Sequence, residues 1–276
     1  MGAGVWVAAG SKGLWNRNPQ GLWRQEEAPP LPLRLAQEEG RVVVACAGGE
    51  VFEAARRRCL TVCPGVEAMA LDAGHLYLLS GETDSLLCCR ASTGEMLYLN
   101  RAGSYPRDMR LDSRGRMLTV AAGAAGEALV FSAPDLRLIR SFKVPGVVWQ
   151  AVFVPGGLAV MTAVEEGQVF TLLGGIWEQR GIFQQWARMP GLPGALCLCR
   201  DGTLTAASSE CLLRCRPRPF KVLWQYRREG LPQHLCDHGN SLLLSDPLQG
   251  RVSLITEPGS EQTLFEGEEI FAQWQV

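Results

Sequence analysis

Few side chains in this sequence could do acid–base chemistry at neutral pH. It contains three histidines, His75, His234 and His238, and imidazole is the group whose ordinary pKa lies closest to neutrality. His75 opens a strand-like run and His238 lies in a turn, where a lone polar residue usually has a structural role. His234 follows Leu231-Pro232-Gln233 at the start of a strand-like segment, so it is the candidate general base.

Other polar side chains begin equivalent segments elsewhere in the chain. Arg107 could hold a carboxylate or phosphate, while Asp108, Glu67 or His234 accepts a proton. Polar groups that converge over an apolar scaffold are the default hypothesis for a ligand site. The alternative is that strand starts are solvated and polar for that reason alone. The candidate ligand-binding residues are Arg34, Arg107, Trp149, Gln150, Gln233 and Gln273.

Sequence motifs for other chemistry are missing. The chain has no Gly-x-Ser-x-Gly nucleophile elbow, no phosphate-binding loop and no dinucleotide-binding fingerprint. One histidine and two acids in separate segments lack the spacing of metal ligands. We therefore expect no metal and no cofactor.

The elements that position these residues repeat along the chain. A turn ending in Gly is followed at once by a strand-like apolar run six times, at Gly40, Gly74, Gly115, Gly157, Gly202 and Gly239. A period of about 40 residues built only from strands and turns is typical of a β-propeller, in which each repeat forms one four-stranded sheet. The sequence thus predicts an all-β fold, with residues 1–276 as a single domain.

Blade boundaries follow from the same pattern. Six blades are predicted to start near Pro32, Val66, Tyr105, Val147, Pro190 and Leu231. Turns between the third and fourth strands are expected at Thr93-Gly94, Pro134-Asp135, Gly174-Gly175 and Pro258-Gly259. Residues 270–276 read as an innermost strand without partners, and residues 4–25 supply three strands without an innermost one. Together they complete a seventh blade, which closes the ring by pairing the C-terminal strand with the N-terminal strands.

The x-Pro strand start, the Asp112-Ser113-Arg114-Gly115-Arg116 turn and the Ser92-Thr93-Gly94-Glu95 hairpin resemble the YVTN and lactonase-like seven-bladed propeller family. The sequence lacks the Trp-Asp dipeptide of WD repeats and the paired glycines of kelch repeats, so those classes fit less well. The resemblance implies the fold and offers one alternative activity, hydrolysis of a small anionic sugar lactone. For that activity Glu67, Arg107 and His234 supply the expected residue types.

Composition restricts the partners and the compartment. A net charge of −1 gives no overall field that would attract nucleic acid or an anionic membrane, and the Arg214–Lys221 stretch reads as a hairpin. No apolar run approaches the length of a membrane span. Of the ten cysteines, Cys197 and Cys199 fall two strands away from Cys211 and Cys215, roughly 9–10 Å. That separation is too large for a disulfide, so we expect reduced thiols and a cytoplasmic location. We also expect a monomer.

Acidic residues gather in the predicted loops between second and third strands. These loops lie on the face where the innermost strands enter the central channel of a propeller, which we call the channel mouth. Such a face could dock a basic partner, or be an ordinary solvated surface. The candidate partner-binding residues are Glu82, Asp84, Glu127, Glu165 and Glu166, with Asp246 in an equivalent loop. The sequence therefore favours a non-catalytic binding or scaffold propeller that recognises a protein partner or small ligand, with the lactone hydrolase as the alternative.

Overall fold

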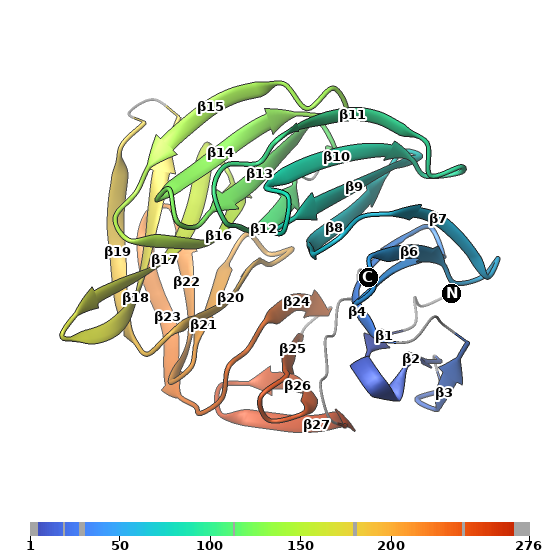
Figure 1. Cartoon of the computed structure of the whole chain (residues 1–276). Helices are drawn as coiled ribbons and strands as arrows, with labels where there is room; N and C mark the ends of the chain where they lie inside the picture. The colour runs from blue at the N-terminus through green and yellow to red at the C-terminus, as the bar shows by residue number, and fades with distance from the viewer. Residues whose placement is uncertain are drawn as a thin grey trace.

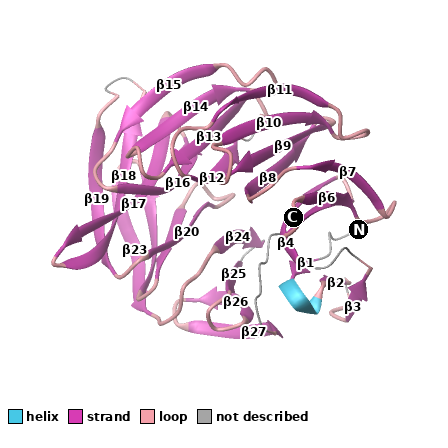
Figure 2. Cartoon of the chain, in the orientation of Figure 1, coloured by secondary structure: helices cyan, strands magenta, loops and turns pink. Residues whose placement is uncertain are grey.

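Seven antiparallel sheets stand around a central channel in the computed structural model, which describes residues 5–18, 20–27, 31–112, 114–178, 181–238 and 241–267 (Figure 1). The protein is a seven-bladed β-propeller, as the repeat predicted. Figure 2 shows that the described residues are almost entirely strands and loops. The one helical element among them is a 3-10 turn, η1 (Gly10–Lys12). No helix in these residues is long and apolar enough to cross a membrane.

Six blades have four strands each, and we name each blade after its innermost strand. The innermost strands are β4 (Pro32–Glu38), β8 (Val66–Asp72), β12 (Pro106–Leu111), β16 (Val147–Val154), β20 (Pro193–Leu198) and β24 (His234–His238). The second strands are β5 (Arg41–Cys46), β9 (His75–Ser80), β13 (Met117–Ala122), β17 (Gly157–Glu166), β21 (Leu204–Ser208) and β25 (Ser241–Asp246). The third strands are β6 (Glu50–Glu53), β10 (Ser85–Arg90), β14 (Glu127–Ser132), β18 (Gln168–Trp177), β22 (Cys211–Pro217) and β26 (Arg251–Glu257). The outer strands are β7 (Arg58–Val62), β11 (Met96–Arg101), β15 (Leu138–Lys143), β19 (Phe183–Pro190), β23 (Phe220–Arg227) and β27 (Ser260–Glu266).

The remaining sheet is N-terminal and has three strands among the described residues. They are β1 (Val5–Ala8), β2 (Leu14–Arg17) and β3 (Trp23–Glu26). The strand predicted at 270–276, and with it the pairing that would add a fourth strand here, lies outside the described residues. That part of the closure stays a prediction.

Packing between neighbouring blades closes the ring within the described residues. Seven apolar clusters fill the seven interfaces between adjacent sheets, including those on either side of the N-terminal sheet. The second strands are buried on both faces because each sheet is covered by a blade on either side, whereas the outer strands are mostly exposed. Each blade depends on its neighbours for a core, as expected of a repeat architecture.

Three boundary predictions differ from the observed elements. Leu231, near which a blade was predicted to start, lies before the inner strand β24, which begins at His234. Pro190, near which a blade was predicted to start, ends β19, and the inner strand begins at Pro193. Gly174-Gly175, predicted as a turn, lies inside the long strand β18. The pairing register with β19 shifts between Leu173 and Gly174, where Trp186 is the extra residue on β19.

Candidate functional site at the channel mouth

Five inner strands share a bulge at one position, which the sequence analysis did not detect. The pairing register with the second strand shifts at Leu33, Glu67, Arg107, Trp149 and Gly194. A bulge places an extra residue opposite a single partner and re-aims the side chains beside it. Among the candidate site residues, Arg107 and Trp149 are bulged residues, and Asp108 and Gln150 directly follow them.

Arg34 and Glu67 join two adjacent blades at this level. The Arg34 Nε donates to the Glu67 backbone carbonyl at 2.7 Å, and its Nη2 lies 3.5 Å from the Glu67 carboxylate. Burial lowers the pKa of Arg34, opposed by the charges of Glu67 and Asp108. Glu67, a candidate general base from the sequence, is therefore engaged by a neighbouring cation.

Asp108, the other candidate carboxylate, is also engaged. It is buried, and the Arg110 Nε donates to its Oδ2 at 2.9 Å. Burial raises the pKa of Asp108, while the charge and hydrogen bond of Arg110 lower it. Sequence reasoning missed Arg110, although residues two apart on a strand share one face.

His234 lies in an electropositive environment. Burial lowers the pKa of its imidazole well below the ordinary value, and the charges of Arg34 and Arg110 lower it further. The Nδ1 is buried and has no hydrogen-bond partner among the described residues. A neutral imidazole whose pKa is far below the working pH is a weak general base, so the lowered pKa argues against the catalytic role considered for His234.

Thiols line the same part of the channel. All ten cysteines are free, and Cys197 and Cys236 are half-buried near Arg110. A hydrogen bond from Cys197 lowers the pKa of the Cys199 thiol to about 7, against the effect of burial. Within the described chain, no group of three His, Cys, Asp or Glu residues could hold a metal ion.

The remaining candidate ligand residues do not form one site. Arg107 is exposed and its guanidinium stacks 5.1 Å from the centre of the Trp149 ring. Gln150 is buried, and its Oε1 accepts the backbone N–H of Leu196 at 2.6 Å. This amide oxygen therefore has a structural partner in the neighbouring blade. Gln233 is half-buried, and Gln273 lies outside the described residues.

The acidic residues of the channel-mouth face are partly neutralised. Glu127 pairs with Lys143 and Glu166 with Arg188, each at 2.9 Å. Asp84 Oδ1 accepts the backbone N–H of Tyr105 at 3.0 Å. Asp246, expected on the same face, is fully buried beside Arg228 and is not part of the surface. Glu82 and Glu165 are exposed and form no ion pair in the described part of the chain.

Exposed apolar side chains lie at the start of several inner strands, on the channel-mouth face. Four inner strands have an exposed apolar residue at one equivalent position, two residues before the bulge, either just before the strand or, in β16, as its first residue. We call these residues the apolar rim: Leu31 (41% exposed), Tyr105 (65%), Val147 (40%) and Leu192 (45%). The equivalent position in the β8 blade is Gly65. The sequence carried this pattern at the blade starts, but only the structure shows that the side chains point to solvent.

The loops that carry the rim are fixed in place. The carbonyls of Leu31, Tyr105 and Leu192 each accept a backbone N–H from the loop after the second strand, at 2.8–3.0 Å. The Leu192 N–H donates to Ser209 Oγ at 2.9 Å, as Tyr105 donates to Asp84. A preorganised apolar surface costs less ordering on binding than a mobile one.

Comparison with solved structures gives propellers. RRP9 WD40 repeats superpose with a TM-score of 0.69 at 12% identity, covering 88% of this chain and 84% of that chain. The Cps50 (Swd1) β-propeller domain of Myceliophteria thermophila gives 0.66 at 9% identity, covering 93% and 98%. Virginiamycin B lyase from Staphylococcus aureus gives 0.59 at 11% identity, covering 73% and 70%.

The fold is that of a β-propeller. At such low identities the likeness shows the fold and nothing about the activity. No family model and no curated protein matches the sequence. The resemblance to the YVTN and lactonase-like family therefore stays an expectation from the sequence.

Proposed function

We propose that this protein is a non-catalytic binding propeller that docks a partner protein on its channel-mouth face. The observation that carries the proposal is the apolar rim, Leu31, Tyr105, Val147 and Leu192. Exposed apolar residues that recur around one opening, with polar residues beside them, are a feature of interaction surfaces. Exposed aromatic residues such as Tyr105 are frequent anchors in such interfaces.

The charged groups of this face supply the specificity. Glu82 and Glu165 are exposed without ion pairs in the described residues, so they suit a partner with basic residues around its apolar contact. Against lactone hydrolysis stand the ion pairs that occupy Glu67 and Asp108, and the lowered pKa of His234.

A pair of double variants tests the proposal. Tyr105→Asp with Leu192→Asp places charge in the rim, and Met96→Asp with Leu138→Asp does so at similarly exposed sites on the outer strands β11 and β15. Proximity labelling with quantitative mass spectrometry should find proteins whose labelling falls about tenfold with the rim variant and stays unchanged with the control. Equal labelling by both variants would reject the rim. Lactone hydrolysis by the wild-type protein that disappears in His234→Ala would reject the non-catalytic role.

A further inference from the structure

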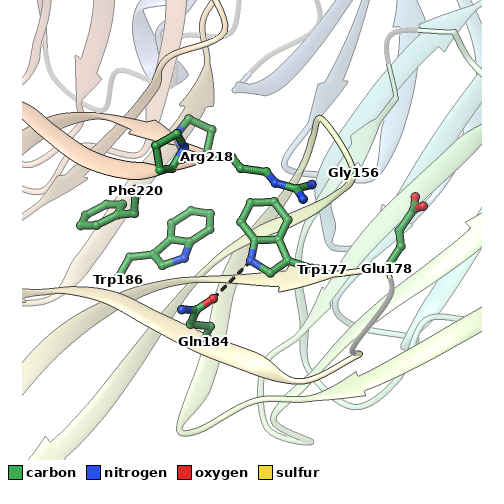
Figure 3. Close-up of a pocket in the computed structure, with 9 residues that line it drawn as sticks. Gly156, Trp177, Glu178, Gln184, Trp186, Arg218 and Phe220 are labelled. Atoms are coloured by element: carbon green, nitrogen blue, oxygen red, sulfur yellow. Dashed lines mark hydrogen bonds between the residues drawn. The ribbon is translucent and has the colours of Figure 1, made fainter.

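A recessed aromatic groove lies between the β16 and β20 blades, on the face opposite the channel mouth. It has a volume of about 440 Å³ and is bounded by Gly156, Trp177, Glu178, Gln184, Trp186 and the turn Pro217–Phe220 (Figure 3). A second hollow of about 410 Å³ adjoins it, sharing Gly156, Pro217 and Arg218 and adding Asp201 and Arg216. Turns between first and second and between third and fourth strands line both hollows, and Gln184 and Trp186 of the outer strand β19 complete the first. These turns lie at the opposite ends of the strands from the apolar rim.

Three half-buried aromatic rings form a ladder along the groove. The ring centres of Trp177 and Trp186 are 5.5 Å apart, and those of Trp186 and Phe220 are 5.7 Å apart at an interplanar angle of 19°. Trp177 Nε1 donates to Gln184 Oε1 at 3.2 Å, which fixes the first ring (Figure 3). Since Trp186 has a ring on each side, the ladder offers its edges to a ligand more than its faces.

The glycine pair in β18 makes the ladder fit. A Cβ at Gly175 would lie 1.9 Å from the Trp186 ring, and one at Gly174 would lie 2.3 Å from the Phe183 ring. These rings therefore lie directly against backbone that carries no side chain. The glycine pair, which the sequence predicted as a turn, thus leaves room for these aromatic rings to pack against the strand.

The groove has an excess of unpaired positive charge. The Arg218 guanidinium stacks 5.3 Å from the centre of the Trp177 ring, and Arg216 is exposed beside it. Neither arginine forms an ion pair within the described residues, whereas Asp201 is already paired with Arg214 at 2.9 Å. Glu178 lies beyond Trp177, at the end away from Phe220 (Figure 3). An incoming anion would meet Arg216 and Arg218 first.

We propose that this groove binds an acidic peptide segment of a partner protein that carries an apolar anchor side chain. The anchor packs on Trp186 and Phe220, and its neighbouring carboxylates pair with Arg218 and Arg216. Aromatic ring edges carry partial positive charge, so peptide carbonyls and carboxylates also suit them. Bases of a single-stranded nucleic acid need open ring faces to stack on, whereas Trp186 has a ring on each side and Arg218 lies over Trp177.

The test uses a fluorescein-labelled nonapeptide pool in which Asp or Glu alternates with Leu or Phe, with binding read as fluorescence anisotropy. Matched pools replace the acids by Lys or the apolar residues by Ala, and a proline-rich peptide and a poly(U) oligonucleotide serve as other ligand classes. The acidic-apolar pool should bind best, and about tenfold more weakly to Trp186→Ala or Arg218→Glu. Arg137→Glu and Tyr98→Ala, exposed changes on the β12 and β8 blades, should change the affinity less than about twofold.

Several outcomes would overturn the proposal. These are no binding of the acidic-apolar pool, equal binding of the Lys pool, tighter binding of the proline-rich peptide or of poly(U), or equal loss in the two control variants. Circular dichroism melting separates folding defects from binding defects, and Arg218→Glu, an exposed change, should melt as the parent does. The Tyr105→Asp, Leu192→Asp variant should bind the pool normally, so this test is independent of the channel-mouth proposal.

Discussion

Some charged side chains of this protein are buried and form ion pairs with one another. Arg228 and Asp246 are the clearest case, because both side chains are almost completely buried and lie 3.1 Å apart. Asp246 Oδ1 also accepts the backbone N–H groups of Leu231 and Gln249 at 3.1 and 3.2 Å. One carboxylate thus fixes the loop that leads into the β24 blade and the turn after β25.

Removing that carboxylate should be costly. Asp246→Ala removes the carboxylate 3.1 Å from the buried Arg228 guanidinium and leaves it the more distant Glu261 at 3.9 Å. We expect a loss of about 3 kcal/mol in the free energy of unfolding, the lower end of the range for breaking a buried ion pair. Glu127→Ala, which breaks the surface pair with Lys143, should cost less than about 1 kcal/mol. Urea denaturation measures both. Similar losses for the two variants would show that the buried pair has no special structural weight.

Turns at the element scale set how closely blades approach each other. Gly94 and Gly74 both adopt the left-handed backbone, with φ of +79° and +81°. A Cβ at Gly94 would lie 1.9 Å from the Leu60 carbonyl oxygen of the adjacent blade, while a Cβ at Gly74 would meet nothing within 4 Å. The two positions therefore separate backbone preference from contact between blades.

Substitution by alanine should reveal that difference. Gly74→Ala is expected to cost about 1–2 kcal/mol from the left-handed conformation alone. Gly94→Ala adds an overlap with backbone that cannot move aside, which we expect to cost roughly 1–3 kcal/mol more. Thermal unfolding compares them. Equal melting temperatures would mean that the β4 and β8 blades can separate locally without loss.

At the scale of the whole molecule, the ring depends on the contact between its first and last described sheets. Phe265 of β27 packs against Trp23 and Trp15, with ring centres 4.9 and 5.6 Å apart. Trp23 Nε1 also donates to the Leu264 carbonyl at 3.0 Å. These contacts link residues from opposite ends of the sequence, so they close the propeller without any covalent connection.

Weakening this contact should loosen the ring locally. Phe265→Ala should cost roughly 2–3 kcal/mol, below the value for a fully buried Phe, and speed amide hydrogen exchange in β1–β3 and β24–β27. Phe142→Ala, between the β12 and β16 blades, should instead speed exchange in β12–β19. Exchange that rises equally throughout the ring in both variants would contradict a closure held by this interface.

The sequence alone determined the architecture because strand alternation and turn chemistry are local and repeat with one period. It placed His234, Arg34 and Asp108 at the start of inner strands, and these residues do lie within one electrostatic environment. The tertiary structure decided what they can do. Burial and the cations from other blades lower the pKa of His234, and Arg110 occupies Asp108.

Exposure and contact between blades were beyond the local pattern. Tyr105 and Leu192 look like ordinary strand-start residues in the sequence, and only the folded loops show that they point to solvent. Gly174-Gly175 looks like a turn in the sequence. The sequence does not show that Trp186, on the neighbouring strand, packs against Gly175. Periodicity fixes which residues form a strand, whereas packing between strands and blades, which brings distant residues together, fixes which surfaces remain open for a partner.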